Sequence, residues 1–202
     1  MKIIDITPAL NINTAVWPGD HPFVYDKEIS GNMTMGKIIT SVHLGAHIDA
    51  PLHITPAGKA LTDLSLEPFI GRCQVVDVSH SQSEYILINE ITDEIRAPRL
   101  LFKTASFDHD KTFTKDYRAF SAELIDALAQ RDIMLLGIDT PSVDLFTEQD
   151  LPVHHRMLYH KIAILEGIRL FGVKSGIYTL IALPLKISGS DGSPVRAVLL
   201  KD

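Results

Sequence analysis

Four side chains that could hold a metal ion or move a proton lie within eleven residues of the sequence, in the stretch HLGAHIDAPLH. They are His43, His47, Asp49 and His53, and they include three of the nine histidines in the chain. Imidazole nitrogen and carboxylate oxygen together suit Zn²⁺, Mn²⁺ or Fe²⁺. The competing interpretation is a set of separately hydrogen-bonded polar residues on a sheet surface. A metal site is favoured because all four residues are of types that bind metals and because they are closely spaced.

The spacing of these residues predicts how the backbone presents them. In an extended strand, residues two apart point to the same face, so one extended segment from His43 to Asp49 would place both histidines and the aspartate together. A helix is disfavoured by Pro51 and by the restriction that it imposes on the preceding residue. Because Pro51 also redirects or stiffens the chain, we expect His53 to lie beside the metal rather than on it.

Further metal ligands must come from a distant part of the chain, because two histidines and one aspartate leave a first-row ion short of protein ligands. Three histidines compete in the segment 151–167: His154, His155 and His160. The same segment carries Glu166 at the end of a short apolar run. A charged residue at the end of a buried run usually needs a partner. A surface carboxylate just past the run is the alternative that the sequence leaves open.

Short β-branched runs predict the strands that would position these groups. They lie at residues 2–6, 74–78, 100–104, 133–138, 178–183 and 195–200. Ser121 is suited to cap an amphipathic helix with Leu124, Ile125 and Leu128 on one face, and a second, shorter helix is predicted over 88–94. This pattern indicates an α/β fold with a mixed sheet and flanking helices. A doubly wound Rossmann fold is not expected, because the glycines form neither GxGxxG nor a P-loop.

Composition limits the classes of protein that fit. A chain of 202 residues predicts one domain, spanning 1–202. The net charge of −6 argues against a nucleic-acid partner, which would need a basic face. No apolar run is long enough for a signal peptide or a membrane span, which indicates a cytoplasmic protein. Cys73 is the only cysteine, so an intrachain disulfide is excluded and the thiol is expected to be a small buried hydrophobe.

The histidine stretch fits the signature HxGxHxDxPxH, and on these residues the chain resembles the cyclase family of metal-dependent hydrolases. Within that family, four further segments resemble the bacterial kynurenine formamidases: WPGD at 17–20, GIDTPSVD at 137–144, AILEG at 163–167 and SPVRAVL at 193–199. The resemblance implies the swivelling β/β/α type of fold. It implies hydrolysis of N-formyl-L-kynurenine to L-kynurenine and formate in tryptophan degradation, by a homodimer with two zinc ions in each subunit. Manganese is the alternative metal.

The resemblance also implies a ligand set. By matching the motif, His43, His47 and Asp49 would hold one ion, and Asp49 would bridge to the second. The second ion would be completed by Glu166 and by the histidine twelve residues before it, which is His154. On one straight helix twelve residues rise about 18 Å, and two ligands of one ion must be much closer. The chain is therefore expected to bend between these two residues.

Two further roles follow from the resemblance. His53 would be the general acid/base that takes a proton from water and passes it to the leaving nitrogen. Trp17 would pack on the substrate ring, although it could also serve only to anchor its own turn. The family has threonine where this chain has Leu44. On an extended strand Leu44 would point away from the ligands, so we expect little loss of metal affinity, with an effect on substrate choice still possible.

Three other functions compete with this hypothesis. A serine hydrolase is disfavoured, because no G-x-S-x-G motif is present and Ser142 lies in a turn-like context after Pro141. A related hydrolase could act on isatin or another aryl or cyclic amide at the same metal site. A non-catalytic metal-binding protein of the same fold is the most distant alternative, and the presence of His53 argues against it because a pure binding site does not require it.

Overall fold

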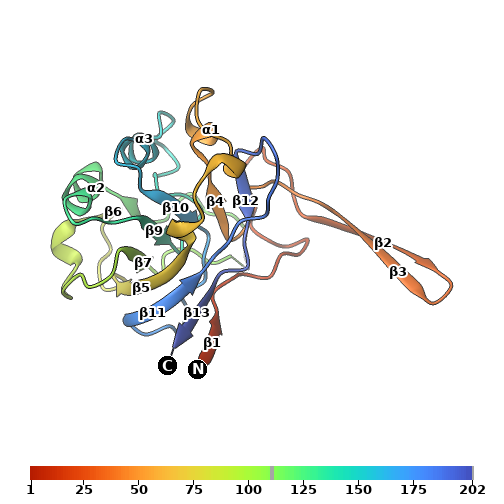
Figure 1. Cartoon of the computed structure of the whole chain (residues 1–202), viewed down its shortest axis with the longest axis horizontal. Coiled ribbons are helices and arrows are strands. Elements are labelled where there is room, and N and C mark those ends of the chain that lie inside the picture. Colours follow the sequence, from red (N-terminus) through yellow and green to blue (C-terminus); the bar gives the residue numbers. More distant parts are fainter. Residues whose placement is uncertain (110–111, 202) are drawn as a thin grey trace.

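A mixed nine-stranded sheet forms the centre of the fold in the computed structural model, which describes residues 1–109 and 112–201 (Figure 1). The strands, in their order across the sheet, are β1 (Lys2–Asp5), β13 (Val198–Lys201), β11 (Gly176–Ile181), β5 (Ile70–Asp77), β7 (Arg99–Lys103), β9 (Leu135–Ile138), β10 (Ala163–Glu166), β4 (His47–Asp49) and β12 (Gly192–Pro194). The four central strands from β5 to β10 are parallel, and the outer pairings are antiparallel. The predicted α/β fold with a mixed sheet is therefore confirmed.

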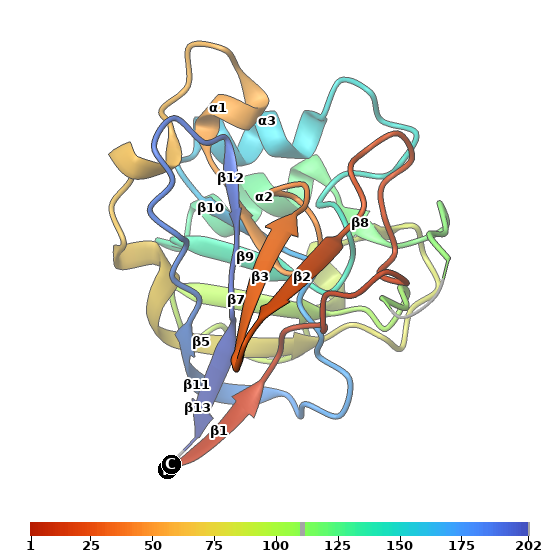
Figure 2. The ribbon, with the colours of Figure 1, turned by 90° about the vertical axis from the view of Figure 1, so that its right-hand side faces the viewer.

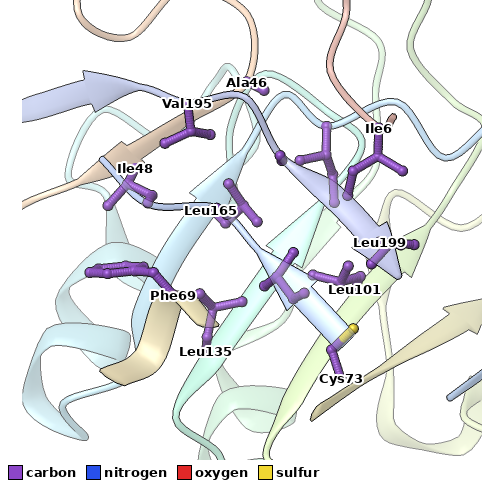
Figure 3. Packing of buried hydrophobic residues seen from close by; sticks show 14 of the residues in the cluster. Ile6, Ala46, Ile48, Phe69, Cys73, Leu101, Leu135, Leu165, Val195 and Leu199 are labelled. Atoms are coloured by element: carbon purple, nitrogen blue, oxygen red, sulfur yellow. The ribbon is translucent and has the colours of Figure 1, made fainter. Parts of the chain in front are cut away.

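The central strands are buried on both faces, and two hydrophobic clusters lie on either side of them. Successive residues of β9 alternate between the clusters: Leu135 belongs to one and Leu136 to the other. The first cluster also holds Ile48, Phe69 and the buried thiol of Cys73 (Figure 3). Because parallel strands need apolar side chains on both faces, their sequences are continuous hydrophobic runs such as LLGI in β9. The prediction that Cys73 is a buried hydrophobe is confirmed.

Two helices cover the second cluster. α2 (Ala122–Ala129) begins as predicted, because the Ser121 side chain accepts a hydrogen bond from the backbone N–H of Leu124 at 3.1 Å. Its apolar face packs beside α3 (Pro152–Tyr159), which contributes Val153 and Met157. The helix predicted over 88–94 is wrong: only a 3-10 turn, η3 (Ile88–Glu90), forms there.

The six predicted strands are all present, although their ends differ by a few residues. The last one begins at Val198, because residues 195–197 lie outside the strand. The remaining elements are α1 (Pro51–Ile54), the 3-10 turns η1 (Leu61–Asp63) and η2 (Glu67–Phe69), and a short parallel pair formed by β6 (Tyr85–Ile86) and β8 (Ala119–Phe120). No helix in the described part of the chain has the length and apolar character needed to cross a membrane.

A two-stranded hairpin projects from the body of the molecule. It consists of β2 (Val24–Ser30) and β3 (Met33–Ile39), which pair only with each other (Figures 1 and 2). Every residue of both strands is exposed, including Ile29 at 70% and Met33 at 66%. This hairpin was not among the strands predicted from the sequence.

Candidate metal centre

Strand β4 presents His47 and Asp49 on one face, as the alternation along a strand predicts. Both residues are buried, with exposed fractions of 2% and 5%. The expectation of one extended segment from His43 is wrong: the strand begins at His47, because Gly45 adopts a φ of +70° and ends the extended conformation. His43 lies in the turn before the strand, and its Nδ1 still reaches Asp49 Oδ1 at 2.9 Å.

Strand β10 brings Glu166 beside β4. The antiparallel register pairs Glu166 with His47, so the glutamate lies opposite the first histidine of the strand. Gly167 allows this approach: its φ is +66°, and a Cβ at this position would lie 2.0 Å from the carbonyl oxygen of Gly45. A larger residue would therefore push the histidine loop away from β10.

Helix α3 supplies His154 from the other side of the same space. The helix ends at Tyr159, and a turn through Lys161, with φ of +57°, leads into β10. The predicted bend between His154 and Glu166 is confirmed, and His154 Nε2 lies 3.4 Å from Glu166 Oε1. The two competing histidines lie elsewhere, because His155 is exposed and His160 Nε2 contacts Asp126 Oδ1 at 2.8 Å.

Each of the two buried carboxylates faces both His47 and His154. Asp49 places Oδ1 3.4 Å from His47 Nε2 and Oδ2 3.3 Å from His154 Nε2. Glu166 places Oε2 3.1 Å from His47 Nε2 and Oε1 3.4 Å from His154 Nε2. The carboxylates therefore connect two groups of nitrogen donors, one around His47 and His43 and the other around His154.

Burial and neighbouring charges act against each other at this cluster. Burial disfavours ionisation of Asp49, but hydrogen bonds from His154 and His43 outweigh it and hold the pKa of Asp49 well below its ordinary value. The pKa of Glu166 is also lowered, by His154 and His47, against burial and the charge of Asp49. Burial lowers the pKa of His43, yet Asp49 and the nearby carboxylate of Asp191 raise it to about 9. The cluster thus stabilises anionic carboxylates beside positive charge.

In two of the histidines, the ring nitrogen that does not face the buried carboxylates has a partner that orients the ring. His47 Nδ1 lies 2.9 Å from the carbonyl oxygen of Gly45, so this nitrogen donates and Nε2 is left free to accept or to bind a cation. His154 Nδ1 lies 2.6 Å from Asp144 Oδ2. Such outer partners fix the orientation of metal-binding histidines. This role of Asp144 was not predicted, although the residue lies in the GIDTPSVD segment that carries the family resemblance.

His53 lies on α1, which begins at Pro51, so the proline does redirect the chain as predicted. The His53 ring packs on His43 with centroids 4.0 Å apart, and 31% of its side chain is exposed. Its Nδ1 is 3.6 Å from Asp191 Oδ2, and the same oxygen is 3.1 Å from His43 Nε2. Burial is the largest cause of a lowered pKa at His53. Asp191 was not predicted as a site residue, because it lies 138 residues beyond His53 and carries no local signal.

The cluster forms the floor of a cavity of about 470 Å³, and Trp17 lies in its wall. The indole packs against Phe146, with ring centroids 5.0 Å apart, and against Phe113 at 5.3 Å. Ser142 also lines the cavity, but its Oγ accepts a hydrogen bond from the backbone N–H of Asp144 at 3.1 Å. No histidine among the described residues is hydrogen-bonded to Ser142, so this serine lacks the base that a nucleophile requires.

The donor set fits a divalent transition-metal ion. Asp49 and Glu166 are buried carboxylates, and no lysine or arginine in the described part of the chain forms an ion pair with either. Buried charges are normally paired or bound to metals. Two three-residue groups have ligand atoms within 4.8 Å of one another: His47, Asp49 and Glu166, and His43, Asp49 and His53. Nitrogen and carboxylate oxygen donors of this kind suit zinc or manganese.

A curled mixed sheet with a buried histidine and carboxylate cluster at one end defines a metal-dependent hydrolase of the cyclase type. The chain belongs to this family: the family model described as "Putative cyclase" matches residues 4–145. The chain is 40% identical to the kynurenine formamidase of Bacillus cereus over 200 residues, covering 97% of this chain and 96% of that protein. It is 41% identical to the kynurenine formamidase of Bacillus anthracis over 202 residues, covering 98% and 97%.

Solved structures share the fold over nearly the whole chain. A protein from Bacillus stearothermophilus described as a "predicted metal-dependent hydrolase" superposes with a TM-score of 0.84 at 29% identity, covering 98% of this chain and 97% of that chain. Isatin hydrolase A from Ralstonia solanacearum superposes with a TM-score of 0.81 at 21% identity, covering 99% and 92%. The second likeness concerns the fold alone, because its sequence identity is low.

Proposed function

We propose that this chain hydrolyses N-formyl-L-kynurenine to L-kynurenine and formate in tryptophan degradation. The observation that carries the proposal is the cluster in which Asp49 and Glu166 each face both His47 and His154, at the floor of a cavity with Trp17 in its wall. The sequence identity of 40–41% with kynurenine formamidases over nearly the whole chain supports the same activity.

Two divalent ions would be held by the cluster, with zinc as the expected metal and manganese as the alternative. His43, His47 and Asp49 would bind one ion, and Asp49, His154 and Glu166 the other. Glu166 would extend this set, because its second oxygen also faces His47, with Oε2 3.1 Å from His47 Nε2. When bound, such ions supply Lewis-acid activation of water and of the formyl carbonyl group.

His53 would be the general acid/base. Its ring packs on His43, with centroids 4.0 Å apart, and lines the cavity where a substrate would bind. From this position His53 would take a proton from the attacking water and donate it to the aniline nitrogen as the C–N bond breaks. Asp191 lies near His53 Nδ1 and would hold the ring so that Nε2 is directed towards the substrate.

Trp17 would pack on the aryl ring of the substrate. Phe113 and Phe146 contact the indole and also each other, with centroids 5.9 Å apart, so the three rings form one aromatic cluster that holds Trp17 in place. Offset or edge-to-face aromatic contacts contribute about 0.5–1.5 kcal/mol each. A preference for aryl over alkyl formamides follows from this arrangement.

The second candidate activity is hydrolysis of isatin or another cyclic amide at the same metal centre. The shared fold with isatin hydrolase A keeps this candidate open, but the low identity supports no more than the fold. The two activities are separated by measuring kcat/KM for N-formyl-L-kynurenine and for isatin with one metal-loaded preparation. A higher kcat/KM for isatin would contradict the proposed activity.

A homodimer is also part of the proposal, as is a cytoplasmic location. The support for the dimer is the β2–β3 hairpin, whose apolar side chains are exposed on both faces. An isolated two-stranded hairpin is only marginally stable in water. Packing of each hairpin against a second copy of the chain would bury these side chains and stabilise the strands.

The activity is tested by measuring formate release from N-formyl-L-kynurenine together with the metal content of the same protein. The expected result is turnover by protein that contains about two ions per chain, with loss of turnover in a Glu166→Gln variant that contains less metal. Metal-loaded wild-type protein that releases no formate from any aryl formamide would contradict the proposal. That result would favour a non-catalytic metal-binding protein.

A further inference from the structure

The cavity above the metal centre has acidic side chains in its wall. Asp20 and Glu148 line it in addition to Glu166 on its floor, and no lysine or arginine is among the described residues that line it. The nearby Lys115 lies on the ring of Phe146, with Nζ 4.4 Å from the ring centroid, and lines a neighbouring cavity. A wall of this composition favours a cationic group of a ligand and disfavours an anionic one.

The two acidic side chains of the wall differ in their hydrogen bonds. Glu148 uses both oxygens: Oε1 accepts from the hydroxyl of Tyr85 at 2.8 Å, and Oε2 accepts from the backbone N–H of Leu145 at 3.0 Å. Asp20 uses one oxygen, since Oδ1 accepts from the backbone N–H of His21 at 2.7 Å. No group among the described residues donates to Asp20 Oδ2, so this oxygen can accept from a ligand.

Asp20 is fixed relative to the aromatic wall of the cavity. Its backbone N–H donates to the carbonyl oxygen of Trp17 at 2.9 Å, so the two residues form the ends of one closed turn. Trp17 is in turn held by its ring contacts with Phe113 and Phe146. A ligand whose ring packs on Trp17 and whose side chain carries a positive charge would meet the carboxylate of Asp20.

We propose that Asp20 binds the ammonium group on the side chain of an aryl formamide substrate. The site would then select aryl formamides with a cationic side chain and would not require a carboxylate on the substrate. N-Formylkynurenine carries both groups, and its carboxylate would face solvent because no cation in the described wall receives it. The inference rests on the proposed formamidase function for the formyl end of the substrate and adds the recognition of the other end.

The inference is tested by ligand binding to the metal-loaded enzyme, independently of turnover. Trp17 is the only tryptophan in the chain, so its fluorescence reports binding in this cavity. The three ligands are kynurenine, its decarboxylated amine and its deaminated acid. The amine is expected to bind about as tightly as kynurenine, and the acid about five- to tenfold more weakly. Equal binding of kynurenine and the deaminated acid would overturn the inference.

Asp20→Asn is the matching variant, because asparagine keeps an oxygen that accepts from the backbone N–H of His21 and removes only the charge. In this variant the preference for the amine over the deaminated acid is expected to fall to about one. The control is Asp93→Asn, an exposed carboxylate outside the cavity, which should keep the full preference. A full preference retained in Asp20→Asn would assign the selectivity to another group and overturn the inference.

Hydrolysis of N-formylaniline, which has no charged side chain, separates this inference from the proposed function. An enzyme that hydrolyses N-formylaniline but binds the three ligands without charge preference is a formamidase without the ammonium site. An enzyme that prefers the cationic ligands but hydrolyses no aryl formamide retains the ammonium site, and the proposed reaction is then wrong.

Discussion

Asp144 Oδ2 lies 2.6 Å from His154 Nδ1, and the same carboxylate accepts hydrogen bonds from the first turn of the helix that carries this histidine. Its two oxygens accept hydrogen bonds from the backbone N–H groups of Val153 at 2.8 Å and His154 at 3.1 Å. One carboxylate therefore caps α3 and holds the imidazole with Nε2 facing Asp49 and Glu166. The position of the helix and the orientation of His154 are therefore fixed by the same residue.

Replacement of Asp144 by asparagine should weaken metal binding. The amide lacks the negative charge that holds the His154 ring, and loss of such an outer partner typically costs about 10–100-fold in metal affinity. Competition against a chelator of known affinity measures this change. Asp126→Asn is a matched control, because Asp126 contacts His160 in the same way outside the site and should leave the metal affinity unchanged. Equal metal affinities of wild type and Asp144→Asn would disprove the role assigned to Asp144.

Replacement of His53 by alanine should leave the metal in place and abolish most of the activity. Loss of a general acid/base lowers kcat by about 10²–10⁴-fold. Elemental analysis and steady-state kinetics on the same preparation measure both quantities. His155→Ala, which removes an exposed histidine of α3, should change neither. If His53→Ala protein loses its metal, His53 is a ligand together with His43 and Asp49.

Removal of the metal should lower both activity and stability. Without the proposed ions, the buried carboxylates of Asp49 and Glu166 would lose their strongest positive partners. A ligand present at about 100 times its dissociation constant stabilises the folded state by about 2.7 kcal/mol. Thermal unfolding of chelated and reloaded protein measures the loss and its recovery. Activity that survives complete chelation but is lost in Ser142→Ala would favour a serine nucleophile instead.

The ion pair between Glu90 and Arg118 should make stability depend on pH. Burial opposes ionisation of Glu90, but hydrogen bonds from Arg118 at 2.9 and 2.7 Å outweigh it and lower the pKa of Glu90 below its ordinary value. The unfolded chain then binds this proton more readily than the folded one. The stabilisation is therefore fully present above the ordinary pKa and is lost as the pH falls through the lowered folded-state pKa.

Glu90→Gln measures that contribution. At pH 7 the variant should be less stable than wild type by about 1 kcal/mol in urea unfolding, and the difference should shrink as the pH falls to about 3.5. Groups that titrate in both proteins contribute equally to the two free energies of unfolding, so their contributions cancel in the difference. A difference that stays constant between these pH values would show that the charge of Glu90 does not contribute.

A charge placed on the projecting hairpin should disrupt the proposed dimer. Ile29→Glu introduces a carboxylate among the apolar side chains of β2, where burial against a second copy would require its desolvation. Light scattering after size-exclusion chromatography should show a shift towards monomer. Phe171→Glu is the matched control, because Phe171 is 87% exposed and lies outside the hairpin. If the Ile29→Glu variant is still a dimer, the interface does not include the hairpin. If the wild-type protein is a monomer, the proposed dimer is wrong.

Local patterns in the sequence predicted the features that depend on near neighbours. The cap at Ser121, the buried run in β9 and the shared face of His47 and Asp49 follow from backbone periodicity within a few residues. The predicted strand from His43 is interrupted at Gly45, where φ is +70°. Glycine can adopt this conformation but can equally adopt an extended one, so the residue type alone did not reveal the interruption. The β2–β3 hairpin was not predicted, since its apolar residues are exposed and pack on no core formed by the described residues.

The sequence by itself determined which chemistry is available: imidazoles and carboxylates at strand spacing, in a motif that resembles a family of metal-dependent hydrolases. Only the tertiary structure decided how these groups meet. The β4–β10 register places Glu166 opposite His47, Asp144 orients His154, and Asp20 closes the turn that carries Trp17. The strand register depends on pairing between residues more than a hundred positions apart, and no local pattern encodes it. The acidic wall above the metal centre is set by the same long-range packing, which brings Asp20 and Glu148 to one cavity.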